Sequence, residues 1–375
     1  MNVLVTGGAG FIGTNLARRL LREGCAVTIL DNFSPQIHGN MRSLPPDLAG
    51  NVELQVGDIR DESAVARALK GQDILVHFAA ETGTGQSVYE ILHYEDVNIR
   101  GMAVLMNCLV TGKASRVGKI VVGSSRAVYG EGKYKCSTDG GVYPEGRRVE
   151  DMIAGKFEPQ CPICGGECEV VPTTEDSPLQ PSSFYGLTKQ VQEQMALLFA
   201  RTAGFSGIAL RYQNVYGPGQ SLKNPYAGIL AIFSNQARLS QPINIFEDGL
   251  ESRDFVYIDD AIEATWRCIV AENMRVETLN VGSGERVAVK ELAGETIDFF
   301  SSRSQVLISG AFRQGDIRHN VADLQKAHNL IGFEPKWRFI DGVRRFLAWV
   351  DSQEPTSNRY DFSLQEMRQR GVLYG

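Results

Sequence analysis

The sequence has no apolar run of about 18 residues or more, so a membrane-spanning helix is excluded. Its opening residues, MNVLVTGGAG, lack the basic stretch, apolar core and cleavage site of a secretory signal. Positive charge is not in excess, because 38 lysines and arginines are set against 44 aspartates and glutamates. A net charge of −6 without a basic stripe disfavours nucleic-acid binding. We therefore expect a cytoplasmic protein with no membrane and no nucleic-acid partner.

Low-complexity segments and internal repeats are also missing from the 375 residues. Hydrophobic residues make up 43% of the chain and charged residues 22%, as is typical of a protein with a substantial core. This length predicts one large α/β domain or two fused units.

Seven cysteines are unevenly distributed along the chain. Three of them, Cys25, Cys108 and Cys268, stand alone in apolar surroundings and are expected to be buried small hydrophobic residues. The other four lie in one glycine- and proline-rich stretch: Cys136, Cys161, Cys164 and Cys168. In a cytoplasmic chain such a cluster favours metal binding over disulfides.

Short β-branched runs alternate with helical patterns over the first two-thirds of the chain. The expected strands are 3–6, 27–30, 52–56, 74–78, 119–122 and 208–211. Near-continuous apolar strands are typical of a parallel sheet that helices cover on both faces. The alternation predicts an α/β fold with a Rossmann-type doubly wound parallel sheet.

After residue 213 the pattern changes to short strands with prolines and glycines. We expect a Rossmann domain at 1–213 and a smaller mixed α/β lobe at 214–375, with part of 250–275 packing back on the first domain. Residues 131–180 fit neither pattern and are expected to form a Cys-rich insert.

The strand at 3–6 runs into a turn that contains Gly7, Gly10 and Gly13, and a helix follows. Such glycines allow a tight turn and a close approach to a pyrophosphate, which the helix N-terminus attracts. Asp31 ends the second strand; its carboxylate would bind both ribose hydroxyls and repel a 2′-phosphate, which favours NAD over NADP. The alternatives are glycines that serve packing alone and an aspartate that caps a helix.

Tyr185 and Lys189 stand one helical turn apart, so they share a helix face. A free tyrosine has a pKa of about 10. A nearby ammonium would bring the pKa of Tyr185 toward neutrality, so that it takes a proton from a sugar hydroxyl while Lys189 holds the nicotinamide ribose. Ser125 follows the strand at 119–122, where it would hydrogen-bond the reacting oxygen. The alternatives are an ordinary helix face and a turn serine.

In this order, the motifs resemble the extended short-chain dehydrogenase/reductase family of sugar-nucleotide epimerases and dehydratases. The resemblance extends from Met1 to about Gly342 and is interrupted by the cysteine segment. It includes HFAA at 77–80, DVN at 96–98, LRYQNVYGP at 210–218, SRDFVY at 252–257, NVGSG at 280–284 and RQGD at 313–316.

The resemblance implies binding residues for NAD and for a nucleotide sugar. The implied NAD contacts are Phe11, Ile12, Asp31, Asn32, Asp58, Ile59, Phe78, Ala79, Ala80, Asn98, Tyr185 and Lys189. In the lobe at 214–375, Asn214, Arg253 and Arg313 would hold the diphosphate, with Asp316 near the nucleoside ribose and Phe246 near the base. Gln213 stands where the family commonly has an aromatic residue. The family further implies a homodimer, formed through helices that begin near residues 98 and 185.

One departure from the family concerns the reaction. Family dehydratases carry Thr-Asp-Glu where this chain has Ser125-Arg126-Ala127, and neither arginine nor alanine replaces the carboxylate pair. The resemblance therefore implies an isomerase, an NAD-dependent 4-epimerase with Ser125, Tyr185 and Lys189 as its catalytic residues. It would oxidise carbon 4 of the sugar and return hydride to the other face of a 4-keto intermediate.

Further segments of the sequence concern the identity of the substrate. The segment 79–87, with Thr82 in a loop that would face the sugar, the cysteine segment and Gln213 carry a closer resemblance within the family. It implies dTDP-L-rhamnose as the substrate and dTDP-6-deoxy-L-talose as the product. The alternatives are a 4-epimerase for UDP-glucose or another nucleotide sugar, a nucleotide-sugar oxidoreductase, and a regulatory NAD-binding protein without turnover.

The cysteine segment has the spacing of a metal knuckle. Cys161 and Cys164 flank two residues and are followed by two glycines, and Cys136 and Cys168 complete four thiolates suited to a closed, structural zinc site. The alternative is reduced cysteines in a loop. Because Tyr185 follows Ser125 by 60 positions, a longer gap than the family usually has, the segment would be an insert between two catalytic elements.

Overall fold

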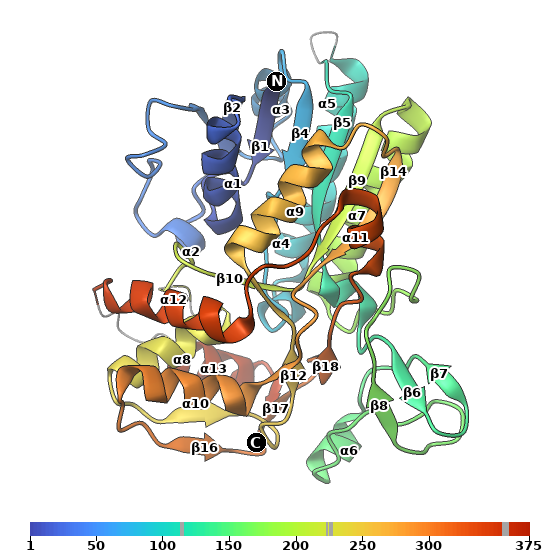
Figure 1. Ribbon diagram of the computed structural model, residues 1–375, viewed down its shortest axis with the longest axis vertical. Coiled ribbons are helices and arrows are strands. Elements are labelled where there is room, and N and C mark those ends of the chain that lie inside the picture. Colours follow the sequence, from blue (N-terminus) through green and yellow to red (C-terminus); the bar gives the residue numbers. More distant parts are fainter. Residues whose placement is uncertain (113–115, 223, 225–227, 355–359) are drawn as a thin grey trace.

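The computed structural model describes residues 1–112, 116–222, 224, 228–354 and 360–375. A sheet with flanking helices occupies one end of the molecule, a smaller mixed lobe the other, and the insert lies beside that lobe (Figure 1). Within these ranges, no helix is both long enough and apolar enough to cross a membrane.

The described part of the chain is built around a seven-stranded sheet in the order β14-β9-β5-β4-β1-β2-β3, and all neighbouring strands in it are parallel. Its strands are β1 (Asn2–Thr6), β2 (Ala26–Asp31), β3 (Glu53–Val56), β4 (Ile74–His77), β5 (Lys119–Ser125), β9 (Ser206–Tyr212) and β14 (Val276–Val281). The winding reverses between β1 and β4, where ligands bind at the carboxyl ends of such sheets. The predicted Rossmann-type fold is confirmed.

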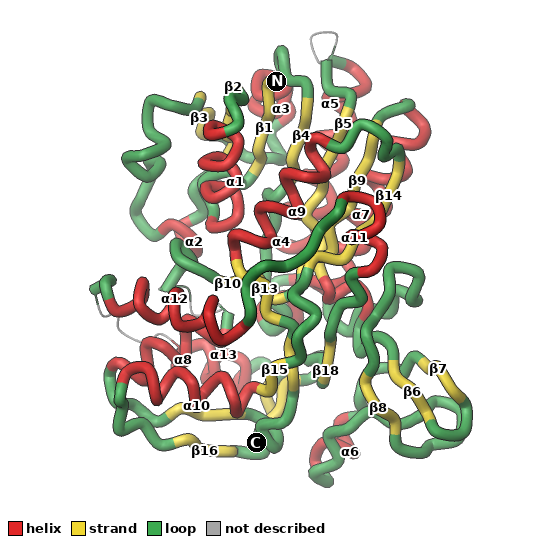
Figure 2. Tube along the Cα trace, in the orientation of Figure 1, coloured by secondary structure: helices red, strands yellow, loops and turns green. Residues whose placement is uncertain are grey.

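Helices cover both faces of this sheet (Figure 2). The two longest are α7 (Phe184–Ala203) and α9 (Ile258–Val270), and α1 (Phe11–Arg22), α3 (Glu62–Leu69) and α5 (Gly101–Thr111) pack with them. The same part of the chain also contains α2 (Pro35–His38), α4 (Ile91–Glu95), α11 (Gln325–Ile331) and the single turns η1 (Gln86–Val88), η2 (Asp96–Arg100) and η3 (Arg126–Tyr129). Successive residues of β1 enter opposite cores: Val3 and Val5 pack with α1, and Leu4 packs with α3 and α5. Burial on both faces explains why the strands are apolar throughout.

The smaller lobe consists of helices over short strands. Its helices are α8 (Ile229–Arg238), α10 (Val289–Phe300), α12 (Phe339–Asp351) and α13 (Tyr360–Gln369). Its strands are β10 (Asn214–Tyr216), β11 (Ile243–Ile245), β12 (Ser252–Arg253), β13 (Phe255–Tyr257), β15 (Val287–Ala288), β16 (Val306–Ile308), β17 (Phe312–Arg313), β18 (His319–Asn320) and β19 (Leu373–Tyr374). The lobe mixes helices and strands as the sequence predicted.

The chain returns to the sheet over a longer stretch than the predicted 250–275. Helix α9 packs beside α1, and β14 then pairs in register with β9, although it lies within 214–375. Its sequence, VETLNV, mixes polar with apolar residues, and its first three residues are only partly buried because this strand is the edge of the sheet. It therefore lacks the apolar run of a central strand.

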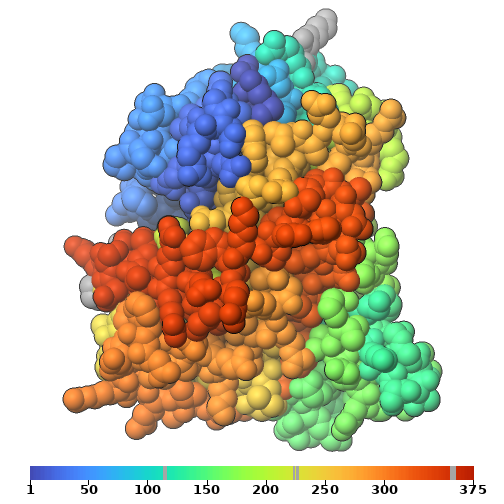
Figure 3. All heavy atoms as spheres, in the orientation of Figure 1, coloured from blue at the N-terminus to red at the C-terminus, as the bar shows by residue number. Residues whose placement is uncertain are grey.

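The insert is a small antiparallel sheet tied to the lobe. Strands β6 (Tyr134–Cys136), β7 (Gly140–Val142) and β8 (Cys168–Val170) pair in the order β7-β6-β8, and α6 (Val149–Ile153) joins them. Most of the remainder is loop (Figure 2), and the segment lies against the lobe (Figure 3).

Two arginines fasten the insert to the lobe. Arg147 of the insert donates to Glu247 Oε2 at 2.9 Å and to the Asp316 carbonyl at 2.8 Å. Arg318 of the lobe, fully buried, donates to Glu158 of the insert at 2.6 Å and to Glu247 at 2.8 Å. Because Arg147 and Arg318 both donate to Glu247, the insert and the lobe form one structural unit.

A buried ion pair connects α7 with β9. Arg211 Nη2 lies 2.6 Å from Glu193 Oε1, and Ser124 of β5 donates to Glu193 Oε2 at 2.6 Å. Arg211 also donates to the Tyr129 hydroxyl and to the Glu175 carbonyl, at 2.9 Å each. One pair of charges therefore joins two strands, a long helix, η3 and the end of the insert.

We expect Glu193→Gln to lower the free energy of unfolding by about 3–5 kcal/mol, because it leaves the Arg211 charge buried without its partner. Urea titration followed by circular dichroism measures this loss. Glu23→Gln, which removes a partly exposed partner of Arg19, is the matched control and should cost less than about 1 kcal/mol. Equal losses in the two variants would contradict the role given to the buried pair.

Candidate active site

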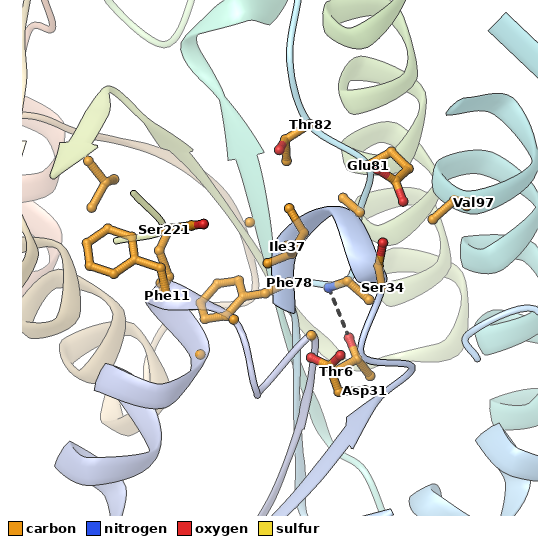
Figure 4. Close-up of a pocket in the computed structure, with 18 of the residues that line it drawn as sticks. Thr6, Phe11, Asp31, Ser34, Ile37, Phe78, Glu81, Thr82, Val97 and Ser221 are labelled. Carbon is orange, nitrogen blue, oxygen red and sulfur yellow. Dashed lines mark hydrogen bonds between the residues drawn. The ribbon is translucent and has the colours of Figure 1, made fainter. Parts of the chain in front are cut away.

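A cavity of about 410 Å³ opens at the carboxyl ends of β1, β4 and β5 (Figure 4). Most of the predicted cofactor residues line it: Gly7, Gly10, Phe11, Ile12, Gly13, Asp31, Asn32, Ile59, Phe78, Ala79, Ala80, Tyr185 and Lys189. Ser125 and Thr82, predicted for the substrate, line it as well. Figure 4 shows Phe11, Asp31, Phe78 and Thr82 surrounding the cavity from different elements.

Two glycines allow the turn after β1 to approach its neighbours closely. Gly7 has φ +67°, and a Cβ atom there would lie 2.7 Å from the Ala79 nitrogen. A Cβ atom on Gly13 would lie 2.6 Å from the Gly7 carbonyl oxygen. Any larger residue would push the start of α1 away from the turn, so the cradle in front of the helix N-terminus depends on glycine.

Asp31 is buried at the end of β2 and held by backbone groups. Its carboxylate accepts hydrogen bonds from the Ala9 nitrogen at 3.0 Å and from the Phe33 nitrogen at 2.8 Å. His38 Nε2 lies 3.6 Å from Asp31 Oδ1; burial lowers the pKa of His38, although the Asp31 charge acts in the opposite direction. A fixed carboxylate in this position suits the ribose hydroxyls of NAD.

Asp58 and Asn98 do not line the cavity. Asp58 is occupied by Arg60, which holds the pKa of that carboxyl well below its usual range, and by the Asn32 amide at 2.9 Å. Asn98 is fully buried in the π-helical turn η2, where its Oδ1 accepts from the Glu81 nitrogen at 2.8 Å. Its Nδ2 donates to Thr188 Oγ1 at 2.9 Å, so Asn98 joins the cavity loop to α7.

Ser125, Tyr185 and Lys189 converge on the cavity from the end of β5 and the first turns of α7. Burial raises the pKa of Tyr185, while the Ser125 hydroxyl and the Arg126 charge lower it. Burial also lowers the pKa of Lys189, to about 7. The positive charge that lowers the pKa of Tyr185 is that of Arg126 and not, as the sequence predicted, that of the Lys189 ammonium.

A chain of hydrogen bonds, which the sequence reasoning missed, holds Lys189. Its Nζ donates to Gln192 Oε1 at 2.5 Å, and Gln192 Nε2 lies 2.8 Å from His77 Nε2. His77 Nδ1 lies 2.7 Å from Thr6 Oγ1, and burial lowers the pKa of His77 to about 3, so the imidazole is neutral. The sequence feature that could have revealed this contact is the position of Gln192, one helical turn after Lys189.

Gln213 faces the cavity, and both polar atoms of its amide are buried without a hydrogen-bond partner among the described residues. An unpaired buried amide is costly unless a ligand satisfies it. With the glycine cradle and Asp31, this donor and acceptor pair fits the carboxamide and sugar groups of a nicotinamide dinucleotide.

The remaining predicted substrate residues do not line this cavity, but three of them lie together. Arg313 Nη2 lies 2.7 Å from Asp316 Oδ2, and the Arg313 guanidinium stands 5.4 Å from the centre of the Phe246 ring. Arg253 Nη1 donates to the Ser252 carbonyl at 2.9 Å. Asn214 Oδ1 is buried and has no hydrogen-bond partner within the described ranges.

The cysteine segment brings three of its four predicted ligands together. Cys136, Cys161, Cys164 and Asp139 have ligand atoms that all lie within 4.8 Å of one another, and the sulfurs of Cys136 and Cys164 are 3.6 Å apart. Cys168 is not in that group: it stands opposite Cys136 across the β6–β8 pair, but its sulfur lies 3.8 Å from the Gly166 carbonyl. Asp139 takes the fourth position because the β6–β7 turn directs its carboxylate at Cys161, at 3.2 Å.

Comparison with known proteins matches residues 3–147 and 161–282 to the model of the NAD dependent epimerase/dehydratase family. The chain is 35% identical to dTDP-L-rhamnose 4-epimerase of Burkholderia thailandensis, over 95% of this chain and 96% of that protein. It is 30% identical to a putative UDP-glucose 4-epimerase of Methanocaldococcus jannaschii, over 94% of this chain and 100% of that protein.

A solved structure agrees with this match. UDP-glucose 4-epimerase of Thermotoga maritima, solved with UDP-glucose, superposes with a TM-score of 0.76 at 29% identity, covering 94% of this chain and 99% of that one. The interruption of the family match falls in the insert, as the resemblance of the motifs implied. The chain therefore belongs to the NAD dependent epimerase/dehydratase family.

Proposed function

We propose that this protein is an NAD-dependent 4-epimerase that interconverts dTDP-L-rhamnose and dTDP-6-deoxy-L-talose. The observation that carries the reaction type is the convergence of Ser125, Tyr185 and Lys189 on one cavity, next to an Arg126-Ala127 pair that supplies no carboxylate for dehydration. The 35% identity to a dTDP-L-rhamnose 4-epimerase over nearly the whole chain supports the substrate.

When bound, NAD would supply the hydride acceptor and donor for carbon 4 of the sugar. The glycine cradle, Asp31 and the Gln213 amide would hold the dinucleotide. Tyr185 would accept the proton of the C4 hydroxyl, and Ser125 would donate a hydrogen bond to the same oxygen as its charge develops. On the substrate side, Asn214, Arg253 and Arg313 would bind the diphosphate, while Asp316 and Phe246 would contact the nucleoside.

We expect Tyr185→Phe to lower kcat about 10²- to 10⁴-fold, because it removes the group that exchanges the proton. The assay follows sugar configuration by NMR with dTDP-L-rhamnose, UDP-glucose and UDP-glucuronic acid, without added cofactor. Tyr143→Phe, in the insert, is the matched control and should keep the parent rate. Full turnover of Tyr185→Phe would refute the mechanism, and steady release of NADH by the parent would identify an oxidoreductase instead.

We also propose a homodimer through α4, α5 and α7. Large apolar side chains on these helices are exposed, including Leu92 (83%), Val110 (72%) and Leu198 (58%). Exposed large apolar residues on neighbouring helices are typical of surfaces that become buried in an interface.

Leu198→Glu should shift the protein from dimer to monomer, because it places a charge in the apolar interface. Size-exclusion chromatography with light scattering measures the mass at micromolar concentration. Leu307→Glu, at an exposed leucine of β16, is the control and should leave the dimer intact. A parent protein that is monomeric under these conditions would rule the proposal out.

The cysteine segment is proposed to hold one structural zinc ion. Sulfurs on a tetrahedral zinc lie about 3.8 Å apart when each Zn–S distance is about 2.3 Å, close to the 3.6 Å between Cys136 and Cys164. The Thr138 and Ile163 nitrogens donate to the sulfurs of Cys136 and Cys161 at 3.4 Å, as thiolate ligands require. We propose that Cys168 becomes the fourth ligand by rotation of its side chain, since it faces Cys136 across the ladder.

The purified parent should contain about one zinc per chain, and Cys164→Ser should contain much less. Cys168→Ser should lose zinc while Asp139→Asn keeps it; the reverse pattern would make Asp139 the fourth ligand. Cys108→Ser, at a buried cysteine outside the segment, is the control. Inductively coupled plasma mass spectrometry gives the metal content, and equal zinc in the parent and Cys164→Ser would defeat the assignment.

A further inference from the structure

Arg126 is the first residue of η3 and directly follows Ser125. Its side chain is partly buried, and its Nη1 atom is enclosed without a hydrogen-bond partner among the described residues. A guanidinium carries five N–H donors and keeps its charge at neutral pH, so leaving one of its nitrogens buried and unpaired is costly. The position therefore calls for an acceptor that the folded chain itself does not provide.

The acids near Arg126 are already occupied. The charges of Asp316 and Glu131 are close enough to raise the pKa of Arg126. However, Asp316 Oδ2 accepts from Arg313, at 2.7 and 2.8 Å. Glu131 accepts from Arg147 at 3.1 Å and from the Arg318 nitrogen at 2.8 Å. Over the described ranges, no carboxylate lies within ion-pair distance of Arg126.

A second arginine increases the demand for an anion. Burial lowers the pKa of Arg126 to about 9, and the positive charge of Arg253 contributes to that shift. Arg253 Nη1 donates to two carbonyl oxygens, those of Ser252 at 2.9 Å and Arg318 at 3.0 Å. The two positive charges thus act on each other, and neither guanidinium has a carboxylate partner among the described residues. A neutral sugar hydroxyl would not offset two positive charges, whereas a diphosphate would.

The backbone holds Arg126 in place. A Cβ atom on Gly130, which has φ +65°, would lie 2.1 Å from the Gln180 carbonyl oxygen. A Cβ atom on Gly186 would lie 2.5 Å from the Ala127 carbonyl oxygen. One end of η3 therefore packs against the segment that leads into α7 and the other against the first turn of α7, so Arg126 is held at a constant position relative to Tyr185.

We propose that Arg126 is a substrate-binding residue that shares the diphosphate of the nucleotide sugar with Arg253. The proposal rests on the proposed function, since it concerns the same substrate. Guanidinium groups bind phosphate oxygens through paired, charge-assisted hydrogen bonds, and a dianion between two arginines satisfies both. The arginine that replaces the acid of the dehydratase motif thus acquires a role of its own.

The test measures binding of dTDP, UDP and inorganic diphosphate to the NAD-loaded protein by isothermal titration calorimetry. We expect Arg126→Ala to weaken the Kd of the nucleotide that the parent binds by roughly ten- to a hundredfold, as loss of charge-assisted hydrogen bonds does. Arg126→Gln, of similar size but uncharged, should show a comparable loss. Arg344→Ala, at an exposed arginine of α12, is the control and should leave the Kd unchanged. The NAD content and melting temperature of each variant report on its fold.

The outcomes separate this proposal from the proposed function. A parent-like Kd in Arg126→Ala or in Arg126→Gln overturns the role of Arg126, whatever the epimerase assay gives. If the parent binds a nucleoside diphosphate and both variants bind it weakly, the role of Arg126 stands even when no sugar is epimerised. A parent that binds none of the three probes overturns both proposals.

Discussion

The buried ion pair between Glu193 and Arg211 is the contact on which the geometry of the site depends. Ser124 donates to Glu193 from the end of β5, one residue before Ser125, and Glu193 stands one helical turn after Lys189 on α7. Parallel strands and their helices are otherwise joined by apolar packing, which tolerates small displacements. A bidentate charge pair in a buried interior has a much narrower range of good geometries. The distance between the two predicted catalytic elements is therefore set by electrostatics.

The same consideration explains why an insert of about fifty residues between those elements leaves them in place. Glu175, near the end of the insert, accepts from Arg211 through its carbonyl, so the chain is fixed to the sheet before it enters α7. Farther out, Arg147 of the insert pairs with Glu247, and Arg318 of the lobe pairs with both Glu247 and Glu158 of the insert. Buried charges of this kind contribute little net stability against apolar packing, but a misplaced partner is costly. They select one orientation of the insert against the lobe.

Burial affects the charges of the two ionisable side chains in the cavity, Tyr185 and Lys189. Burial raises the pKa of Tyr185 and lowers that of Lys189, so it favours the neutral form of each side chain. The interior therefore opposes the charge pattern that a tyrosine base needs, and the Ser125 hydroxyl and the Arg126 charge counteract it. Replacing the dehydratase acid by Arg126 thus has two effects at once: it removes a carboxylate and adds a positive charge beside the phenol.

The sequence by itself determined six of the seven strands of the sheet, the glycine cradle, the place of Asp31 at the end of β2 and the position of Tyr185 and Lys189 on one helix, because each is a local pattern of strand, turn or helix. It also indicated the insert and three of the clustered cysteines. Only the tertiary structure decided which polar groups meet: Gln192 with Lys189, Asn98 with Thr188, Asp139 rather than Cys168 among the ligand atoms, and Arg211 with Glu193. The physical reason is that a hydrogen bond depends on distance and direction in space. Residues far apart along the chain acquire these only when the sheet and its helices have packed.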